Sequence, residues 1–110
     1  MKYFTTVENR KGSIYYEFYK GKWDEKTFWK NDSICVHDDI WYGLDIDLII
    51  MSAIPQYAPF GETEVTEVQW NTVLEEAKKK GGETYTAVLE ADVWAKENFK
   101  EHKVFTILGL

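Results

Sequence analysis

Alternation of apolar and polar positions predicts most of the strands in this chain. Residues 2–8 and 14–20 alternate and are rich in aromatic and β-branched side chains, a composition typical of strands. Residues 9–13 between them contain a glycine and have the chemistry of a hairpin loop, so the two strands are expected to pair directly. Short apolar runs predict further strands at 33–37 and 104–108.

A strand is also predicted at residues 43–50. Apolar and acidic side chains alternate in the first half of this segment, and the second half is apolar on both sides, as in a strand that enters a core. Residues 53–63 follow with Pro55, Pro59 and Gly61, and these residue types predict a loop.

The clearest helix is predicted over residues 67–80. Thr66 and Gln69 have the spacing of a capping box, and Gly81 supplies a helix stop. Between them an apolar stripe at positions i, i+3, i+4 and i+7 gives the predicted helix one buried face. The stripe consists of Trp70, Val73, Leu74 and Ala77.

The segment after this helix is ambiguous. Residues 84–90 alternate well enough for a strand, whereas apolar residues from Val88 to Phe99 also share one helical face. We favour a helix that covers at least residues 93–101. Together the elements predict one α+β domain over residues 1–110, with a mostly antiparallel sheet of four to six strands packed on one face by about two helices.

Charge is distributed unevenly along the chain, whose net charge is −6. Residues 31–77 contain no lysine or arginine but ten carboxylates, which implies a directional negative field. Such a field disfavours nucleic acid and anionic membranes as partners and favours a basic protein. The alternative is an ordinary acidic surface that aids solubility.

Aromatic side chains are abundant, with five Trp, seven Tyr and six Phe. Trp70 and Trp94 are expected in the core, while Trp23, Trp29 and Trp41 lie in or beside predicted loops. Because interface hot spots are enriched in such residues, one of these three is expected to anchor a partner together with Tyr57 or Phe60. The predicted partner-binding residues are Asp38, Asp39, Trp41, Asp45, Asp47, Tyr57, Phe60, Glu62 and Glu64.

Two kinds of catalytic site are possible alternatives. Asp45 and Asp47 with His37 and its two neighbouring aspartates offer oxygen and nitrogen ligands for a divalent cation, although the spacing of an EF-hand is lacking. Cys35 and His37 would share one face of a strand and offer a thiolate–imidazole pair. No catalytic motif is recognisable, so we expect no enzyme and no cofactor, and a self-associating scaffold is the remaining alternative.

The location is predicted from the single cysteine and the first residues. Cys35 has no disulfide partner, which favours a reducing compartment, and the amino-terminal residues lack the pattern of a secretory signal. A cytoplasmic protein is therefore expected.

The chain resembles the small acidic immunity proteins of bacterial polymorphic or contact-dependent toxin systems. The resemblance rests on size, acidity, tryptophan content, the Gln69-Trp70 pair in the predicted helix and the carboxyl-terminal residues 105–110. It implies a stoichiometric inhibitor that neutralises a basic toxin or nuclease by covering its active site or an adjacent surface, and it assigns no individual residue.

Overall fold

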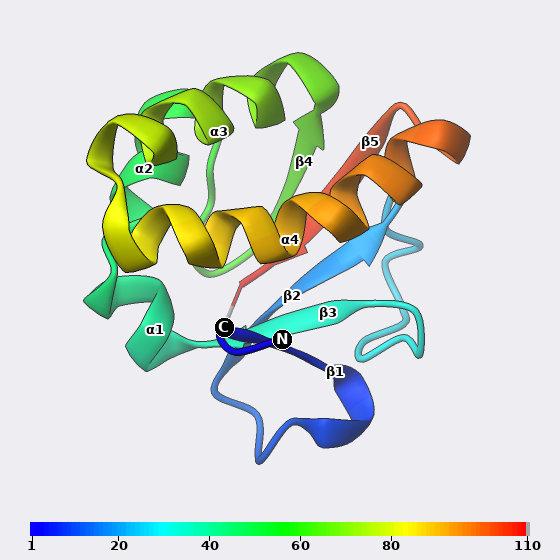
Figure 1. Ribbon diagram of the computed structural model, residues 1–110. Coiled ribbons are helices and arrows are strands. Elements are labelled where there is room, and N and C mark those ends of the chain that lie inside the picture. Colours follow the sequence, from blue (N-terminus) through cyan, green and yellow to red (C-terminus); the bar gives the residue numbers. More distant parts are fainter. Residues whose placement is uncertain (110) are drawn as a thin grey trace.

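A five-stranded antiparallel sheet in the order β1-β3-β2-β5-β4 forms one layer of the computed structural model, which describes residues 1–109 (Figure 1). The strands are β1 (Phe4–Thr6), β2 (Tyr15–Lys20), β3 (Ile34–His37), β4 (Glu62–Thr66) and β5 (Val104–Leu108). The helices are α1 (Asp38–Gly43), α2 (Ile46–Ala53), α3 (Glu67–Lys80) and α4 (Gly82–Glu101), and a short 3-10 helix, η1, spans Val7–Asn9. The predicted α+β class is confirmed, with more helices than the sequence indicated.

The helices cover one face of the sheet, and α4 crosses in front of it in Figure 1. Phe18, Val36 and Phe105 point from the sheet into the core, where they meet Trp70 of α3 and small residues of α4 such as Ala91. These small residues allow α4 to lie close to the sheet. Within residues 1–109, no helix combines the length and the apolar character needed to cross a membrane.

The predicted hairpin between the first two strands is wrong, because β3 lies between them. Phe4 of β1 and Tyr16 of β2 both face Val36 of β3 in antiparallel register. Cys35 and Val36 are fully buried although they point to opposite faces of the sheet, and such a strand requires an interior position. The chain leaves β1 after three residues through η1, so β1 is a short edge strand.

The strand predicted at residues 43–50 is also wrong. This segment forms the end of α1 and most of α2, with Asp45 between them in a left-handed conformation (φ 56°). Ile46, Ile49 and Ile50 are buried at helical spacing, whereas Leu48 remains 54% exposed. The buried side chains of this segment therefore follow the helical period, and the alternation in its first half does not correspond to a strand.

The strand β4 begins inside the predicted loop. Thr63 and Val65 are buried and alternate with the exposed Glu62 and Glu64, so the acidic pair lies on the sheet face away from the helices. Val65 belongs to the core cluster, which fixes this register.

The predicted helix over residues 67–80 is confirmed together with its capping box between Thr66 and Gln69. The following segment forms one long helix, so the strand reading of residues 84–90 is wrong and the favoured helix begins earlier than residue 93. Trp70 donates its indole N–H to Asp92 at 2.9 Å and so joins α3 to α4. The predicted strand at 104–108 is confirmed as β5.

A loop formed by residues 21–33 covers the centre of the second sheet face. Glu17 is 1% exposed, and its carboxylate accepts hydrogen bonds from the backbone N–H groups of Trp29 and Lys30 at 2.7 and 3.1 Å. Thr106 donates its hydroxyl to the Gly21 carbonyl at 2.8 Å. These bonds satisfy buried polar groups and fix the loop over β2 and β5, which leaves the acidic side chains of β4 beside its edge.

Candidate partner-binding groove

The predicted partner-binding residues do not form one surface. Asp38 and Asp39 begin α1, Asp45 and Asp47 lie at the start of α2, Trp41 and Tyr57 pack on the core, and Phe60, Glu62 and Glu64 lie on or next to β4. In the sheet, β2 and β5 lie between β3 and β4. His37 at the end of β3 and Glu62 at the start of β4 are therefore three strand spacings apart, about 14 Å.

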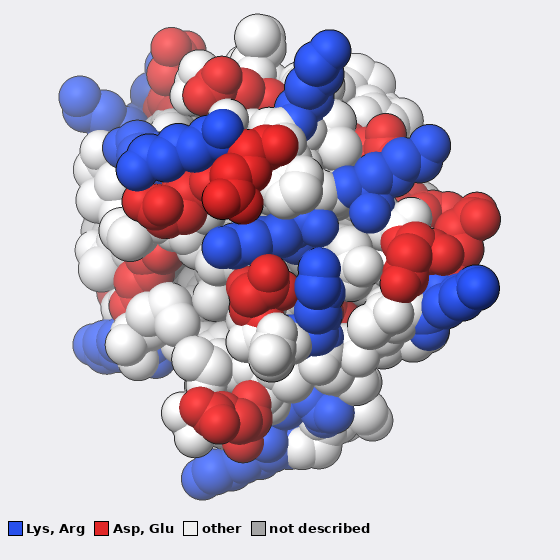
Figure 2. Space-filling model, turned by 90° about the vertical axis from the view of Figure 1, so that its right-hand side faces the viewer, with Lys and Arg blue, Asp and Glu red and all other residues white. Residues whose placement is uncertain are grey.

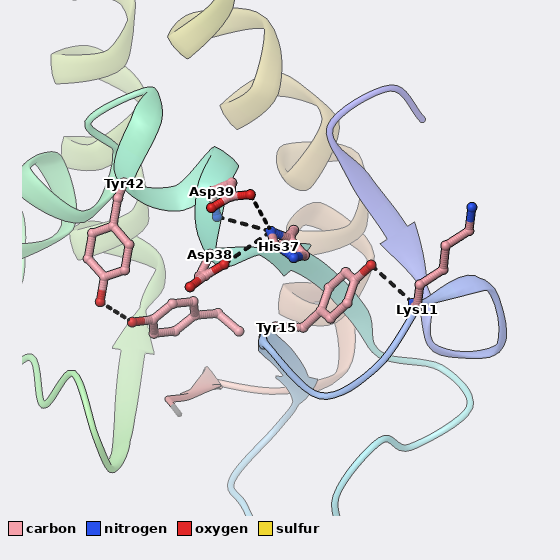
Figure 3. Close-up of polar contacts among 7 residues, drawn as sticks. Lys11, Tyr15, His37, Asp38, Asp39 and Tyr42 are labelled. Atoms are coloured by element: carbon pink, nitrogen blue, oxygen red, sulfur yellow. Dashed lines mark hydrogen bonds and ion pairs between the residues drawn. The ribbon is translucent and has the colours of Figure 1, made fainter.

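The first acidic group surrounds His37 at the end of β3 (Figure 3). His37 Nδ1 accepts a hydrogen bond from the Asp39 backbone N–H at 3.1 Å and lies 3.1 Å from a carboxylate oxygen of Asp38. The rings of Tyr15 and His37 pack in a T-shaped arrangement, with 5.1 Å between their centroids. Candidate ligand atoms of His37, Asp38 and Asp39 lie within 4.8 Å of one another, so they could approach one cation.

This group has a structural explanation. The His37 side chain caps the first turn of α1, and the two aspartates lie at the positive end of that helix. Asp45 and Asp47, which were expected to contribute to the same cation site, belong instead to the start of α2. The geometry therefore favours helix capping over a cation site.

The second acidic group is partly neutralised. Asp45 forms an ion pair with Lys80 at 2.8 Å, across the contact between α2 and α3. Burial and the neighbouring Asp45 charge raise the pKa of Asp47 above its ordinary value, partly offset by backbone hydrogen bonds. The absence of lysine and arginine from residues 31–77 therefore does not leave Asp45 unpaired, because Lys80 of α3 reaches it.

Trp41 cannot anchor a partner, because its side chain is fully buried. It stacks on Tyr16, with 4.7 Å between ring centroids and an interplanar angle of 19°. The hydroxyl groups of Tyr16 and Tyr42 share a hydrogen bond at the rim of this cluster (Figure 3). Tyr57 is half-buried against the core, and burial raises the pKa of its hydroxyl. Both predicted anchors therefore act mainly in packing.

Cys35 is a buried thiol. It shares a sheet face with His37 as expected, but desolvation and the nearby charge of Glu17 raise its pKa to about 12. A thiol with such a pKa is protonated at neutral pH, so the thiolate–imidazole pair considered from the sequence is not formed.

The remaining predicted residues come together in one place. Phe60, Glu62 and Glu64 form one wall of a groove, and Trp23 and Phe28 of the covering loop form the other. We call this feature the β4 groove and define it by these five residues together with Glu25. It consists of two adjoining hollows of about 440 and 400 Å³ that share Trp23 and Glu62.

Hydrogen bonds within the loop hold the second wall in place. The Asp24 carboxylate accepts bonds from the backbone N–H groups of Lys26 and Thr27 and from the Thr27 hydroxyl, at 2.6 to 2.9 Å. These bonds, with the hydroxyl bond the strongest, lower the pKa of Asp24 to about 2. Trp23 donates its indole N–H to the Thr27 carbonyl at 2.6 Å and packs on Phe28 at 5.2 Å. The loop therefore presents the two aromatic rings in a fixed arrangement.

The β4 groove combines negative charge with exposed aromatic surface. One hollow is lined by three carboxylates, those of Glu25, Glu62 and Glu64, against the single ammonium of Lys22. Within residues 1–109, the ion pairs do not involve any of these three carboxylates. Phe60 is 82% exposed. This surface can attract a cationic group and bury an apolar one beside it.

The surface charge is mixed on one side of the molecule. Figure 2 shows acidic and basic side chains next to one another over the face on the right-hand side of Figure 1. That side of the molecule is therefore not uniformly acidic.

Three residues of the β4 groove were not assigned to the partner-binding site from the sequence. Trp23 was only one of several candidate anchors, and Phe28 and Glu25 were not considered. The available signal was the unusual presence of Trp23 and Phe28 in an otherwise polar segment, which indicates aromatic rings that a loop must either bury or present.

Comparison of the chain with family models, with curated proteins and with solved structures found no match.

Proposed function

We propose that this chain is a stoichiometric binding protein that accepts a basic protein in its β4 groove. Two features support this proposal: Glu62 and Glu64 form no ion pair within residues 1–109, and Phe60 is 82% exposed. Together with the resemblance to small acidic immunity proteins, they favour an intracellular inhibitor of a basic toxin or nuclease.

The two components of the groove have different roles in binding. Carboxylates at the rim attract a cationic partner over several ångströms, so they raise the association rate and select the partner more than they add affinity. Phe60 supplies the affinity, because removal of a phenylalanine side chain from water contributes about 1.5–3 kcal/mol. The inhibition itself is steric, since the bound chain covers the partner's functional surface.

The proposal is tested with a charge-reversed variant. The partner is captured from cells that produce the chain, purified, and its binding is measured by stopped-flow mixing at low and high salt. Glu62→Lys combined with Glu64→Lys should slow association at least tenfold at low salt and flatten its dependence on salt. The chain should also neutralise the partner's toxic or nuclease activity at a ratio of one to one.

The matched control makes the same change in net charge elsewhere. Glu75 of α3 and Glu101 at the end of α4 are exposed and lie outside the groove, so Glu75→Lys combined with Glu101→Lys should leave association nearly unchanged. Equal effects of the two double variants would show that only the net charge matters, and the groove would not be the binding site.

A further inference from the structure

We infer that the β4 groove recognises a two-residue signature in an extended segment of its partner. An arginine or lysine side chain occupies the acidic hollow, and a large apolar side chain two positions away occupies the other. This inference rests on the proposed function and specifies what the groove binds.

The acidic hollow has the chemistry of a site for a single cationic side chain. Glu25 and Trp23 line this hollow from the loop, and Glu64 lines it from β4. An arginine guanidinium can pair with a carboxylate through two parallel hydrogen bonds and can stack on an indole ring. Lys22 in the same hollow leaves a net excess of negative charge, so an incoming cation is still favoured.

The second hollow is apolar and has a firm floor. Phe28, Phe60 and Leu108 line this hollow. The Leu108 side chain is buried in the free chain, with 3% of its surface exposed. Gly109 donates its backbone N–H to the Gly61 carbonyl at 2.8 Å. The hollow is therefore a fixed pocket for an apolar side chain rather than a gap that a partner must open.

The floor also depends on a close backbone contact. A Cβ atom on Gly109 would collide with the carbonyl oxygen of Pro59, so only glycine allows the end of β5 to approach the turn before β4 this closely.

The spacing of the two hollows follows from β4. Glu62 and Glu64 line the acidic hollow, and Phe60 and Glu62 line the apolar one. The two hollows are therefore offset by about two residues along the chain, a step of roughly 6.8 Å in an extended strand. The acidic hollow lies toward Glu64 and the apolar hollow toward Phe60, with Glu62 shared. Side chains i and i+2 of an extended segment point to the same side and have this same spacing, so one segment can fill both hollows.

Binding through side chains is favoured over addition of a strand to the edge of β4. Gln56 donates its side-chain amide to the Glu64 carbonyl at 3.0 Å, and the Ala58 backbone N–H bonds the Thr63 hydroxyl at 2.9 Å. The chain before β4 therefore covers part of this edge and occupies the main-chain carbonyl of Glu64.

The test uses blocked five-residue peptides, titrated into the isotope-labelled chain at low salt and followed by NMR. The parent sequences are Gly-Arg-Ser-Phe-Gly and the reverse order Gly-Phe-Ser-Arg-Gly. At least one parent should bind at millimolar concentration and shift the Trp23 indole signal and the backbone signals of residues 60–64. Replacement of its arginine by glutamine, or of its phenylalanine by alanine, should weaken binding roughly five- to tenfold.

Variants of the chain assign each preference to its hollow. Phe60→Ala should abolish the preference for phenylalanine over alanine and keep the preference for arginine over glutamine. Glu64→Gln should have the opposite effect, and Glu75→Gln on α3 should change neither. Phe60 and Glu64 are exposed, so both variants should keep the wild-type melting temperature, which is checked first.

Three results would overturn the inference. These are the absence of binding by both parent peptides, shifts confined to α1 and α2, and peptide binding in which Phe60→Ala and Glu64→Gln weaken all peptides equally. Strand addition would instead show as protection of the Glu62 and Glu64 amides from hydrogen exchange without side-chain preference. Since the peptides replace the partner, these failures are separate from a failure of the proposed function, which is tested with the partner itself.

Discussion

At the scale of single residues, burial separates aromatic side chains that stabilise the fold from those that are free to bind. Trp41 and Phe60 both lie near acidic residues in the sequence, yet Trp41 is fully buried and Phe60 is 82% exposed. The sequence neighbours of the two residues do not reveal this difference, because burial depends on the helices and strands that pack on each ring. The sequence therefore predicted which kinds of side chain line the candidate site better than it predicted which individual residues do.

Replacement of Trp41 tests its assignment to the core. Trp41→Ala should lower the free energy of unfolding by about 3–5 kcal/mol, because it leaves a large cavity beside Tyr16. Phe60→Ala should change it by less than about 0.5 kcal/mol. Urea denaturation followed by circular dichroism measures both. A Trp41→Ala chain of normal stability that no longer binds its partner would restore Trp41 as an anchor.

Titration of Asp24 tests the order of the loop that carries Trp23. The folded pKa of about 2 lies below the ordinary value of 3.8, so this carboxylate stabilises the fold above pH 3.8. That contribution is lost as the pH falls through about 2. The carboxyl carbon signal in NMR should therefore titrate near pH 2.

Thr27→Val provides the matched variant. It removes the hydroxyl that donates to Asp24 at 2.6 Å, so the pKa of Asp24 should rise toward 3.8. A wild-type Asp24 that titrates near pH 4, with no response to Thr27→Val, would mean that the hydrogen-bonded turn is not formed in solution.

At the scale of elements, the sequence predicted best those segments whose local signals agree. The capping box, the apolar stripe and the glycine stop all indicate α3, and its bounds match the prediction. In residues 43–50 the alternation suggested a strand while Ile46, Ile49 and Ile50 supported a helix, and packing against α3 decided between them. Local periodicity cannot settle such a segment.

Local sequence patterns do not predict the order of the strands in the sheet. The insertion of β3 between β1 and β2 depends on contacts between residues about 30 positions apart, such as Phe4 and Val36. The same holds for β4, whose register with β5 places Glu62 opposite Leu108 and so creates the groove. The acidic and aromatic character of the site was predictable, whereas the second wall with Trp23 and Phe28 was not.

The attachment of β1 to α4 gives a test at this scale. The Glu90 carboxylate accepts hydrogen bonds from the backbone N–H groups of Lys2, Tyr3 and Phe4 at 2.7 to 2.9 Å. Glu90→Gln should lower the free energy of unfolding by about 2 kcal/mol. The acceptor loses its charge, and the amide NH2 that replaces one carboxylate oxygen cannot accept the bond from the Lys2 N–H. The same variant should also increase hydrogen exchange in β1.

Glu97→Gln on the same helix is the control. Among residues 1–109, Glu97 pairs only with the exposed Lys100, at 3.0 Å. Its replacement should therefore change the free energy of unfolding by less than about 0.5 kcal/mol. If the two variants are equally stable, Glu90 does not hold the amino-terminal strand.

At the scale of the whole molecule, the fold converts an acidic stretch of sequence into separate local features. Lysines of α3 reach Asp45 and Glu76, α1 uses Asp38 and Asp39 at its amino-terminal end, and the β4 groove keeps its carboxylates unpaired. Linear charge density therefore overestimates the extent of an acidic surface. The basic partner that we propose rests instead on the carboxylates of the β4 groove, which lie beside the exposed Phe28 and Phe60.

The central claim is that the β4 groove is the surface that meets a basic partner, and a footprint of the complex tests it most directly. Hydrogen exchange and side-chain labelling are compared for the free and the partner-bound chain. The account predicts protection of residues 22–28 and 59–65, with Trp23 and Phe60 shielded from labelling and residues 38–53 unchanged. Protection of residues 38–53 with no change at Phe60 would contradict it.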